Sequence, residues 1–215
     1  MNSVLTPGMY FGLFGLGWVS WWASEYLIHR FVGHGRLTQI PFTRHHRKHH
    51  ALGNYFTPIM EKVKVSIGVG GGIFFFLGLI LGWEISGTYT SGFILSYLCY
   101  EWVHRRAHSH PPTNRYGRWI RRHHFYHHFM NPSSNHGVTT ILGDLLLGTN
   151  ELPKKIKVPE KLKMDWLTNP ETGDVWQDFS KDYELIYLRK TAPERRRKST
   201  QPINSNKDRL SIPCA

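Results

Sequence analysis

The uneven placement of basic residues constrains this chain more than any other feature of its sequence. All 27 Lys and Arg residues lie in residues 30–64 and 104–215, which leaves residues 1–29 and 65–103 without a basic side chain. The mean hydropathy of −0.37 is that of an ordinary soluble domain, but this average hides the segregation. Apolar stretches flanked by clustered basic residues are typical of integral membrane proteins.

Three apolar stretches are candidates for membrane-spanning helices: residues 8–28, 65–83 and 87–103. A helix rises about 1.5 Å per residue, so roughly 20 residues cross a hydrocarbon core about 30 Å thick. Short polar residues between 84 and 91 join the last two stretches, which predicts an antiparallel hairpin. We therefore expect an all-α integral membrane protein with three to four transmembrane helices.

Glycines four residues apart occur in these apolar stretches, as Gly8 with Gly12, Gly68 with Gly72 and Gly78 with Gly82. Such spacing lets two helices approach closely in a membrane. It is equally well explained by the apolar composition, and both interpretations stay open.

The net charge of +12 and the isoelectric point near 9.9 could indicate a nucleic-acid-binding protein. The distribution argues against a nucleic-acid partner, because basic residues flank the predicted spans, as the positive-inside rule expects of cytoplasmic segments. The stretch at residues 8–28 is a poor secretory signal, because no basic residue precedes it and it exceeds the usual ~7–15 apolar residues.

The sequence lacks the motifs of several common protein classes. The two cysteines, Cys99 and Cys214, are too few for a disulfide framework or a cysteine-based zinc module. No Gly-rich phosphate loop, GxSxG elbow or HExxH motif occurs, which argues against a nucleotide-binding enzyme, a serine hydrolase or a zinc hydrolase.

Histidine is the main chemical signal, with fourteen residues that avoid the centres of the apolar stretches. Twelve of them group in the segments HRFVGH, HHRKHH, HRRAH and RRHHFYHH, and the other two are His110 and His136. Helix positions three and four residues apart lie on one face, so each face could direct two or three imidazoles to a common point. The sets that share a face are His46 with His49 and His50, His104 with His108, and His124 with His127 and His128.

Neutral imidazole suits iron, zinc, copper and nickel, whereas magnesium and calcium prefer oxygen, so these groups predict a transition-metal site. Two predicted crossings separate His50 from His104, which returns both halves of the histidine set to one side of the membrane. That side carries the basic residues, so we expect a helical, histidine-rich metal-binding cap in the cytosol and residues 84–91 on the opposite side.

The four segments, with a hairpin between the second and third, resemble the histidine boxes of the fatty acid hydroxylase and sterol desaturase superfamily. Residues 124–149, HFYHHFMNPSSNHGVTTILGDLLLGT, strengthen the resemblance, because members commonly follow the last box with a Gly-Val-Thr-like segment, an Asp and a Gly-Thr. The resemblance covers about residues 25–149.

The resemblance implies a membrane-bound oxygenase that hydroxylates a lipid C–H bond with O2. Two iron ions would be bound, although zinc can occupy such sites in purified samples. Electrons would come from a separate donor of the cytochrome b5 or ferredoxin type, since no HPGG haem motif occurs here. Carried over box by box, the implied metal ligands are His29, His34, His46, His49, His50, His104, His108, His124, His127 and His128.

Other histidines are less certain ligands. His45 and His123 adjoin the boxes and could replace their neighbours, but solvated interfacial side chains are the favoured interpretation. His110 precedes two prolines in a predicted turn and is not expected to bind metal. His136 is either a partner of the ligands or a polar loop residue.

Three carboxylates are candidate partners of the ligands. Glu25 lies four residues before His29, and Glu101 lies three before His104, so each could orient an imidazole through its second nitrogen. The alternative for Glu25 is a side chain that reaches the membrane surface. Asp144 matches the acidic position of the family, with a helix cap or loop role as the alternative.

The predicted organisation is a membrane-embedded catalytic domain at residues 1–150, a cytosolic C-terminal cap at 151–189 and a disordered basic tail at 190–215. The expected location is the inner membrane if the protein is bacterial, or the endoplasmic reticulum if it is eukaryotic. A lipid desaturase of the same superfamily is one alternative function. A histidine-rich metal-binding or transport protein is another, although transport favours ionisable residues within the spans.

Overall fold

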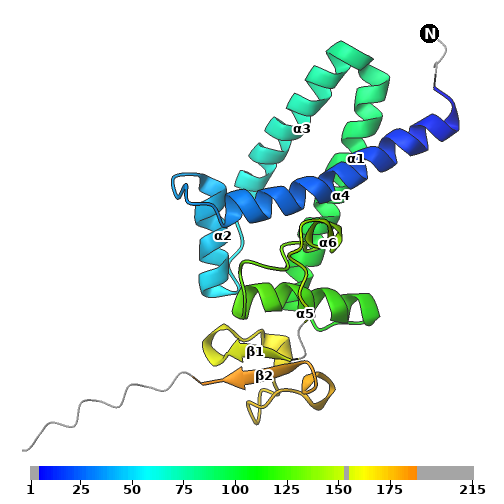
Figure 1. The fold of residues 1–215 in the computed structure, drawn as a ribbon. Helices are drawn as coiled ribbons and strands as arrows, with labels where there is room; N and C mark the ends of the chain where they lie inside the picture. Colours follow the sequence, from blue (N-terminus) through cyan, green and yellow to red (C-terminus); the bar gives the residue numbers. More distant parts are fainter. Residues whose placement is uncertain (1–4, 153–154, 188–215) are drawn as a thin grey trace, which may run out of the picture.

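The computed structural model describes residues 5–152 and 155–187 (Figure 1). In this part of the chain, α-helices alternate with short connections and precede a small two-stranded sheet. The helical elements are α1 (Pro7–Leu27), the π-helix η1 (Ile28–Gly33), α2 (Pro41–Leu52), α3 (Ile59–Leu81), α4 (Trp83–Ser109), α5 (Arg115–Phe129) and α6 (Leu142–Leu146). The C-terminal elements are the strands β1 (Ile156–Pro159) and β2 (Tyr183–Ile186) and, between them, the short 3₁₀-helices η2 (Glu160–Leu162), η3 (Asp165–Leu167) and η4 (Gln177–Phe179).

Helices α1 and α4 pack side by side and run in the same direction. Phe14 of α1 lies against Gly92 of α4, and further along both helices Trp21 lies against Tyr97. The C-terminal end of α1, which leads into the first histidine box, is therefore level with the end of α4 that carries His104.

Helices α3 and α4 form the expected antiparallel hairpin (Figure 1). The expected polar link at residues 84–91 is wrong, because the chain reverses at Gly82, whose φ is +93°, and residues 84–91 belong to α4. The hydroxyls of Thr88 and Ser91 donate to carbonyls of the preceding turn. Ser86 donates to the carbonyl of Phe74 in α3. These polar side chains are thus satisfied inside a helix and do not interrupt it.

Two glycines allow the close approach of α1 and α4. A Cβ added to Gly17 would lie 2.0 Å from the carbonyl oxygen of Tyr89, and one added to Gly92 would lie 2.1 Å from that of Phe14. Of the spaced glycines considered from the sequence, Gly78 lies at a close contact, because an added Cβ would be 2.1 Å from the ring of Trp83 at the start of α4, but the others do not. No atom lies within 4 Å of a Cβ added at Gly8, Gly12, Gly68 or Gly72.

By length and composition, one helix of the described residues can cross a membrane, α3, with a mean hydropathy of 2.0. Large apolar side chains on α1, α3 and α4 also point away from the protein, as expected of lipid-facing positions. Examples that are more than half exposed are Phe11, Phe76, Ile80, Leu98 and Trp102. The total of three to four spans and the cytosolic side of the histidine groups stay predictions.

The C-terminal segment packs beneath α5 and contains the sheet, so the expectation of an all-α fold is wrong here (Figure 1). Strands β1 and β2 pair in parallel, with Ile156 opposite Tyr183. Each strand has four residues, which is too short for an alternation of apolar and polar residues to be recognised in the sequence. The sheet buries one face with α5 in a cluster of Phe125, Ile156, Val158, Met164, Trp166, Leu167 and Tyr183.

The Trp166 indole donates to the carbonyl of Ala107 at 3.1 Å, which ties this segment to the end of α4. The boundaries of the three predicted domains stay predictions. The predicted disordered tail at residues 190–215 lies outside the described residues.

The close approach of α1 and α4 generates a prediction. Gly17→Val should destabilise the protein by about 1–3 kcal/mol, because the branched side chain collides with the backbone of α4. Gly15→Val, two residues away on the same helix and with no atom near an added Cβ, is the control. Thermal unfolding in detergent micelles measures both, and equal midpoints for the two variants would contradict the packing.

Candidate metal centre

The π-helix η1 brings the first two histidines together. Its hydrogen bonds join residues five apart, and the N–H of His34 donates to the carbonyl of His29. In an α-helix, positions five apart point in different directions. In this segment the ring centroids of His29 and His34 are 5.3 Å apart. The π-helix therefore explains why the first box has a five-residue interval.

Helices α2 and α5 each send histidines to two different points. His46 and His50, four residues apart on α2, belong to one group of ligand nitrogens, and His49 between them belongs to another. Consecutive helix positions differ by about 100° in direction, so His49 and His50 lie on either side of the helix face. The expectation that each face directs its imidazoles to a common point is therefore wrong for the second and fourth boxes, whereas His104 and His108 enter a single group as expected.

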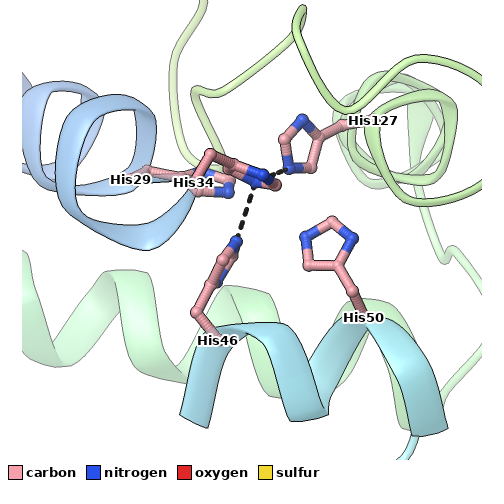
Figure 2. Close-up of side chains that lie close together, drawn as sticks. All are labelled: His29, His34, His46, His50 and His127. Atoms are coloured by element: carbon pink, nitrogen blue, oxygen red, sulfur yellow. Dashed lines mark hydrogen bonds between the residues drawn. The ribbon is translucent and has the colours of Figure 1, made fainter. Parts of the chain in front are cut away.

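The ten histidines expected to bind metal meet in two groups of five, and within each group the ligand nitrogens lie within 4.8 Å of one another. The first group, shown in Figure 2, consists of His29, His34, His46, His50 and His127. The second consists of His49, His104, His108, His124 and His128. The rings of His50 and His128 stack with centroids 4.0 Å apart, so the two groups adjoin.

Helix α5 supplies both groups in the same way as α2. His124 and His128 belong to the second group, and His127 belongs to the first. Helix α4 continues to Ser109 and presents His104 and His108 on one face, as the sequence predicts.

The imidazoles are neutral near pH 7. Burial lowers the pKa of His34 and His49 to about 4 and that of His50 to about 3. Burial also lowers the pKa of His127 and His128 well below the usual value, and neighbouring imidazoles add to the shift. Neutral imidazole is the form that binds metal ions, so no proton needs to leave first.

Backbone carbonyls orient several of these rings. Nδ1 of His49 donates to the carbonyl of Tyr55 at 2.6 Å, and Nδ1 of His127 donates to that of Ser134 at 2.8 Å. Nδ1 of His29 donates to the carbonyl of His136. Each bond leaves the lone pair on Nε2, which faces its group.

The nitrogens inside the groups suit metal ions better than they suit one another. Within the described residues, Nε2 of His29, Nε2 of His50 and both nitrogens of His128 are buried without a hydrogen-bond partner. Nε2 of His34 lies 2.9 Å from Nε2 of both His46 and His127. Two ligands at right angles, each about 2.1 Å from an ion, have a similar separation. Five imidazoles exceed a tetrahedral zinc site and fit a metal of higher coordination number.

The histidines next to the boxes lie outside both groups. His45 is bonded to the Tyr55 hydroxyl and to Glu61, and the exposed His110 contacts the Ser109 hydroxyl. His123 is 3% exposed and stacks on Trp119, so the favoured solvated position is wrong for His123. His123 lies on a face of α5 that is turned away from the groups, and its Nε2 lies 3.6 Å from a carboxylate oxygen of Asp144 in α6.

Two of the candidate carboxylates have partners other than the ligand rings. Glu101 forms an ion pair with Lys62 of α3, whereas Nε2 of His104 faces Nε2 of His49, so the expected bond from Glu101 to a ligand does not occur. Glu25 accepts hydrogen bonds from Val138 and Thr139 and not from His29.

Asp144 is fully buried and anchors the loop before it. It accepts hydrogen bonds from the backbone of His136 and Gly137 and from the Thr149 hydroxyl. Burial raises the pKa of Asp144, but the hydrogen bonds outweigh this effect and hold the pKa below its usual value. The ring of His136 lies near those of His29 and His127, with centroids 5.6 and 5.2 Å away, but His136 belongs to neither group.

Sequence reasoning missed Lys62 and the backbone acceptors at Tyr55 and Ser134. The sequence did offer a signal for Lys62. It is a cation just before the apolar stretch at 65–83, and an antiparallel hairpin brings that end of the stretch close to Glu101. No sequence signal identifies a backbone carbonyl as the partner of a distant imidazole.

The comparisons with known proteins agree with this geometry. The family model for fatty acid hydroxylases matches residues 14–149, which contain both histidine groups. The chain belongs to the fatty acid hydroxylase family. The resemblance of its boxes to the fatty acid hydroxylase and sterol desaturase superfamily is thereby confirmed.

Relatives of this fatty acid hydroxylase family member carry the name fatty acid 2-hydroxylase. The protein from Rattus norvegicus is 31% identical over 69% of this chain, and the one from Homo sapiens is 32% identical over 68%. The one from Macaca fascicularis is 33% identical over 66%. The chain spans about two fifths of each relative, 42%, 42% and 40% respectively. No solved structure matches the chain.

The division into two groups predicts separable metal losses. His127→Ala should remove the metal of the first group, and His128→Ala that of the second, because these adjacent side chains belong to different groups. Metal analysis of each purified variant should find about half the wild-type content, with His110→Ala at the wild-type level. Loss of all metal in either variant, or of none in both, would contradict the division.

The lowered pKa values predict that the metal-free protein loses stability in acid. The folded-state pKa of His50 is about 3, against 6.5 in the unfolded chain, so the unfolded state binds more protons below about pH 6.5. Stability should therefore fall as the pH is lowered from about 7 toward 4. Unfolding midpoints of the metal-free protein across this range measure the effect. A His50→Asn variant should show a shallower decline, and midpoints that do not change with pH would refute the prediction.

Proposed function

We propose that this protein is a membrane-bound lipid hydroxylase that inserts one oxygen atom of O2 into a C–H bond of a fatty acyl chain or related lipid. Family membership and relatives named fatty acid 2-hydroxylase support an oxidoreductase of this kind. A transport protein is less well supported, because the histidines meet in two closed groups and do not line a path across the bilayer.

The observation that carries the proposal is an apolar cavity that opens onto the first histidine group. It encloses about 640 Å³ between α1, α3 and α4, and His29 lies in its wall. Its lining is mainly aliphatic and aromatic, as at Val69, Ile73 and Phe93. A lipid chain can therefore lie beside the first group with water excluded.

The charged side chains of the cavity gather at the end near the histidines. Lys62 and Glu101 form their ion pair there, and Ile73 marks the apolar part about 16 Å further along α3, from the rise of a helix. A lipid whose polar end meets Lys62 and whose tail follows α3 presents carbons near its polar end to His29. The names of the relatives specify carbon 2 of a fatty acid, which is the carbon next to the carboxyl group.

The reaction consumes R–H, O2, two electrons and two protons and yields R–OH and water. Two iron ions, when bound, supply the activation of O2 that breaks an unactivated C–H bond. The chain's own residues hold neutral nitrogen ligands in fixed orientation, exclude water with the aromatic wall of Trp21, Phe93 and Tyr100, and keep the lipid chain beside His29. Zinc uses the same imidazole ligands, so activity has to be compared with iron content.

The remaining elements of the proposal follow from topology and chemistry. The two histidine groups lie at the cytoplasmic surface of a multi-pass membrane protein, beside the basic residues that follow α4. Electrons come from a separate cytochrome b5-type or ferredoxin-type donor with its reductase.

Untargeted lipid mass spectrometry tests the function. Cells that express the wild-type chain with a compatible reductase should accumulate a lipid that is heavier by one oxygen atom, and cells with His127→Ala should not. A lipid lighter by two hydrogen atoms would establish a desaturase instead. Equal lipid profiles from wild-type and variant cells, with both proteins expressed and iron bound to the wild type, would overturn the proposal.

A further inference from the structure

The loop at residues 136–139 is held through four consecutive backbone N–H groups by two buried carboxylates. Asp144 provides one half of this arrangement. The N–H groups of His136 and Gly137 donate to its two oxygens, each at 2.8 Å. The Thr149 hydroxyl adds a third hydrogen bond at 2.7 Å and fixes the carboxylate itself.

Glu25 provides the other half. The N–H groups of Val138 and Thr139 donate to its Oε1 at 2.5 and 3.1 Å, and the Thr139 hydroxyl donates to Oε2 at 2.6 Å. The side chain is buried, at 4% exposure. A buried carboxylate is costly unless hydrogen bonds compensate it, so this contact specifies one position for the loop.

The clamped loop touches the first histidine group directly. The carbonyl of His136 accepts a hydrogen bond from Nδ1 of His29, one helical turn beyond Glu25. The end of α1 therefore contacts the loop twice, through a carboxylate and through a ligand ring. Ser134, just before the loop, accepts the bond from His127 of the same group.

The second histidine group takes an acceptor from elsewhere. His49 donates to the carbonyl of Tyr55 in the connection between α2 and α3. The loop at residues 136–139 thus serves one group and not the other, although the two groups adjoin.

We propose that Glu25 and Asp144 are positioning residues that fix the carbonyl of His136, and through it the ring of His29, and so set the metal affinity of the first group alone. This inference rests on the metal centre of the proposed function. Neither carboxylate contacts the metal nitrogens. Outer partners of histidine ligands typically contribute about 10- to 100-fold to metal affinity.

Zinc titration of two parent proteins separates the groups. Parent A carries His104→Ala and His108→Ala and keeps the first group, and parent B carries His34→Ala and His46→Ala and keeps the second. Glu25→Gln and Asp144→Asn are introduced into each full-length parent. In parent A the zinc dissociation constant should rise about 10- to 100-fold, and in parent B it should stay within about twofold.

Two further variants test the contact at a single atom. Thr139→Val removes only the hydroxyl that donates to Glu25, so it should weaken zinc binding in parent A in the same direction but less. Thr139→Ser restores a hydroxyl and should recover the affinity of parent A. Asp182→Asn controls for a general loss of stability, because Asp182 is also a buried carboxylate but pairs with Arg118, away from the loop.

Equal weakening in both parents, or no weakening in parent A, would overturn the positioning role. A Thr139→Ser protein as weak as Thr139→Val would do so as well. If parent A binds no zinc at all, the first metal site fails and this inference fails with it. If parent A binds zinc normally and the carboxylate variants change nothing, the inference fails and the proposed function stands.

Discussion

Ten imidazole rings turn their nitrogens toward two points in the interior of the protein, and the positions of the surrounding helices and loops depend on this convergence. A neutral imidazole has one donor and one acceptor, so several Nε2 atoms that face each other cannot all find hydrogen bonds. Metal ions bound at the two points would resolve that conflict on the inner side. On the outer side, backbone carbonyls accept hydrogen bonds from Nδ1 of His29, His49 and His127 and hold these three rings in one orientation.

The long helices make this meeting possible. Because α1 and α4 run in the same direction, the histidines at the end of α1 and at the end of α4 lie close together although they are far apart in the sequence. Helix α3 packs antiparallel to α4, and its Lys62 pairs with Glu101 near the same end. The contact of Gly17 with the backbone of α4 holds this frame tightly together. The same frame leaves an apolar cavity whose wall includes His29, so the packing of the helices and the access of the proposed lipid substrate depend on one arrangement.

The sequence predicted the helical hairpin, the ten converging histidines and the family, because each depends on a local pattern of apolar stretches or repeated spacings. It did not predict how the boxes divide. The spacing of His46, His49 and His50 shows that they lie near one helix face, but only the position of neighbouring helices decides which ring turns to which side. The partners of Glu25 and Glu101 were also missed, since they lie on segments distant in sequence.

Local chemistry explains the remaining errors. Polar residues 84–91 suggested a loop, but their hydroxyls bond to helix carbonyls, which a composition pattern does not show. The parallel strands β1 and β2 are too short for an alternation pattern, and their pairing is fixed by burial against α5.

The π-helix η1 allows the first box to be one residue longer than an α-helical pair. Its five-residue interval exceeds by one the spacing that stacks side chains on an α-helix. Loss of one residue between His29 and His34 would let α1 continue in regular α-helical form, and the remaining four-residue interval would keep both imidazoles on one face. If the five-residue interval were kept in α-helical form, the second imidazole would instead point to a different side of the helix. The wide turn and the extra residue thus compensate each other, so a single-codon deletion here should be tolerated better than loss of the π turn alone.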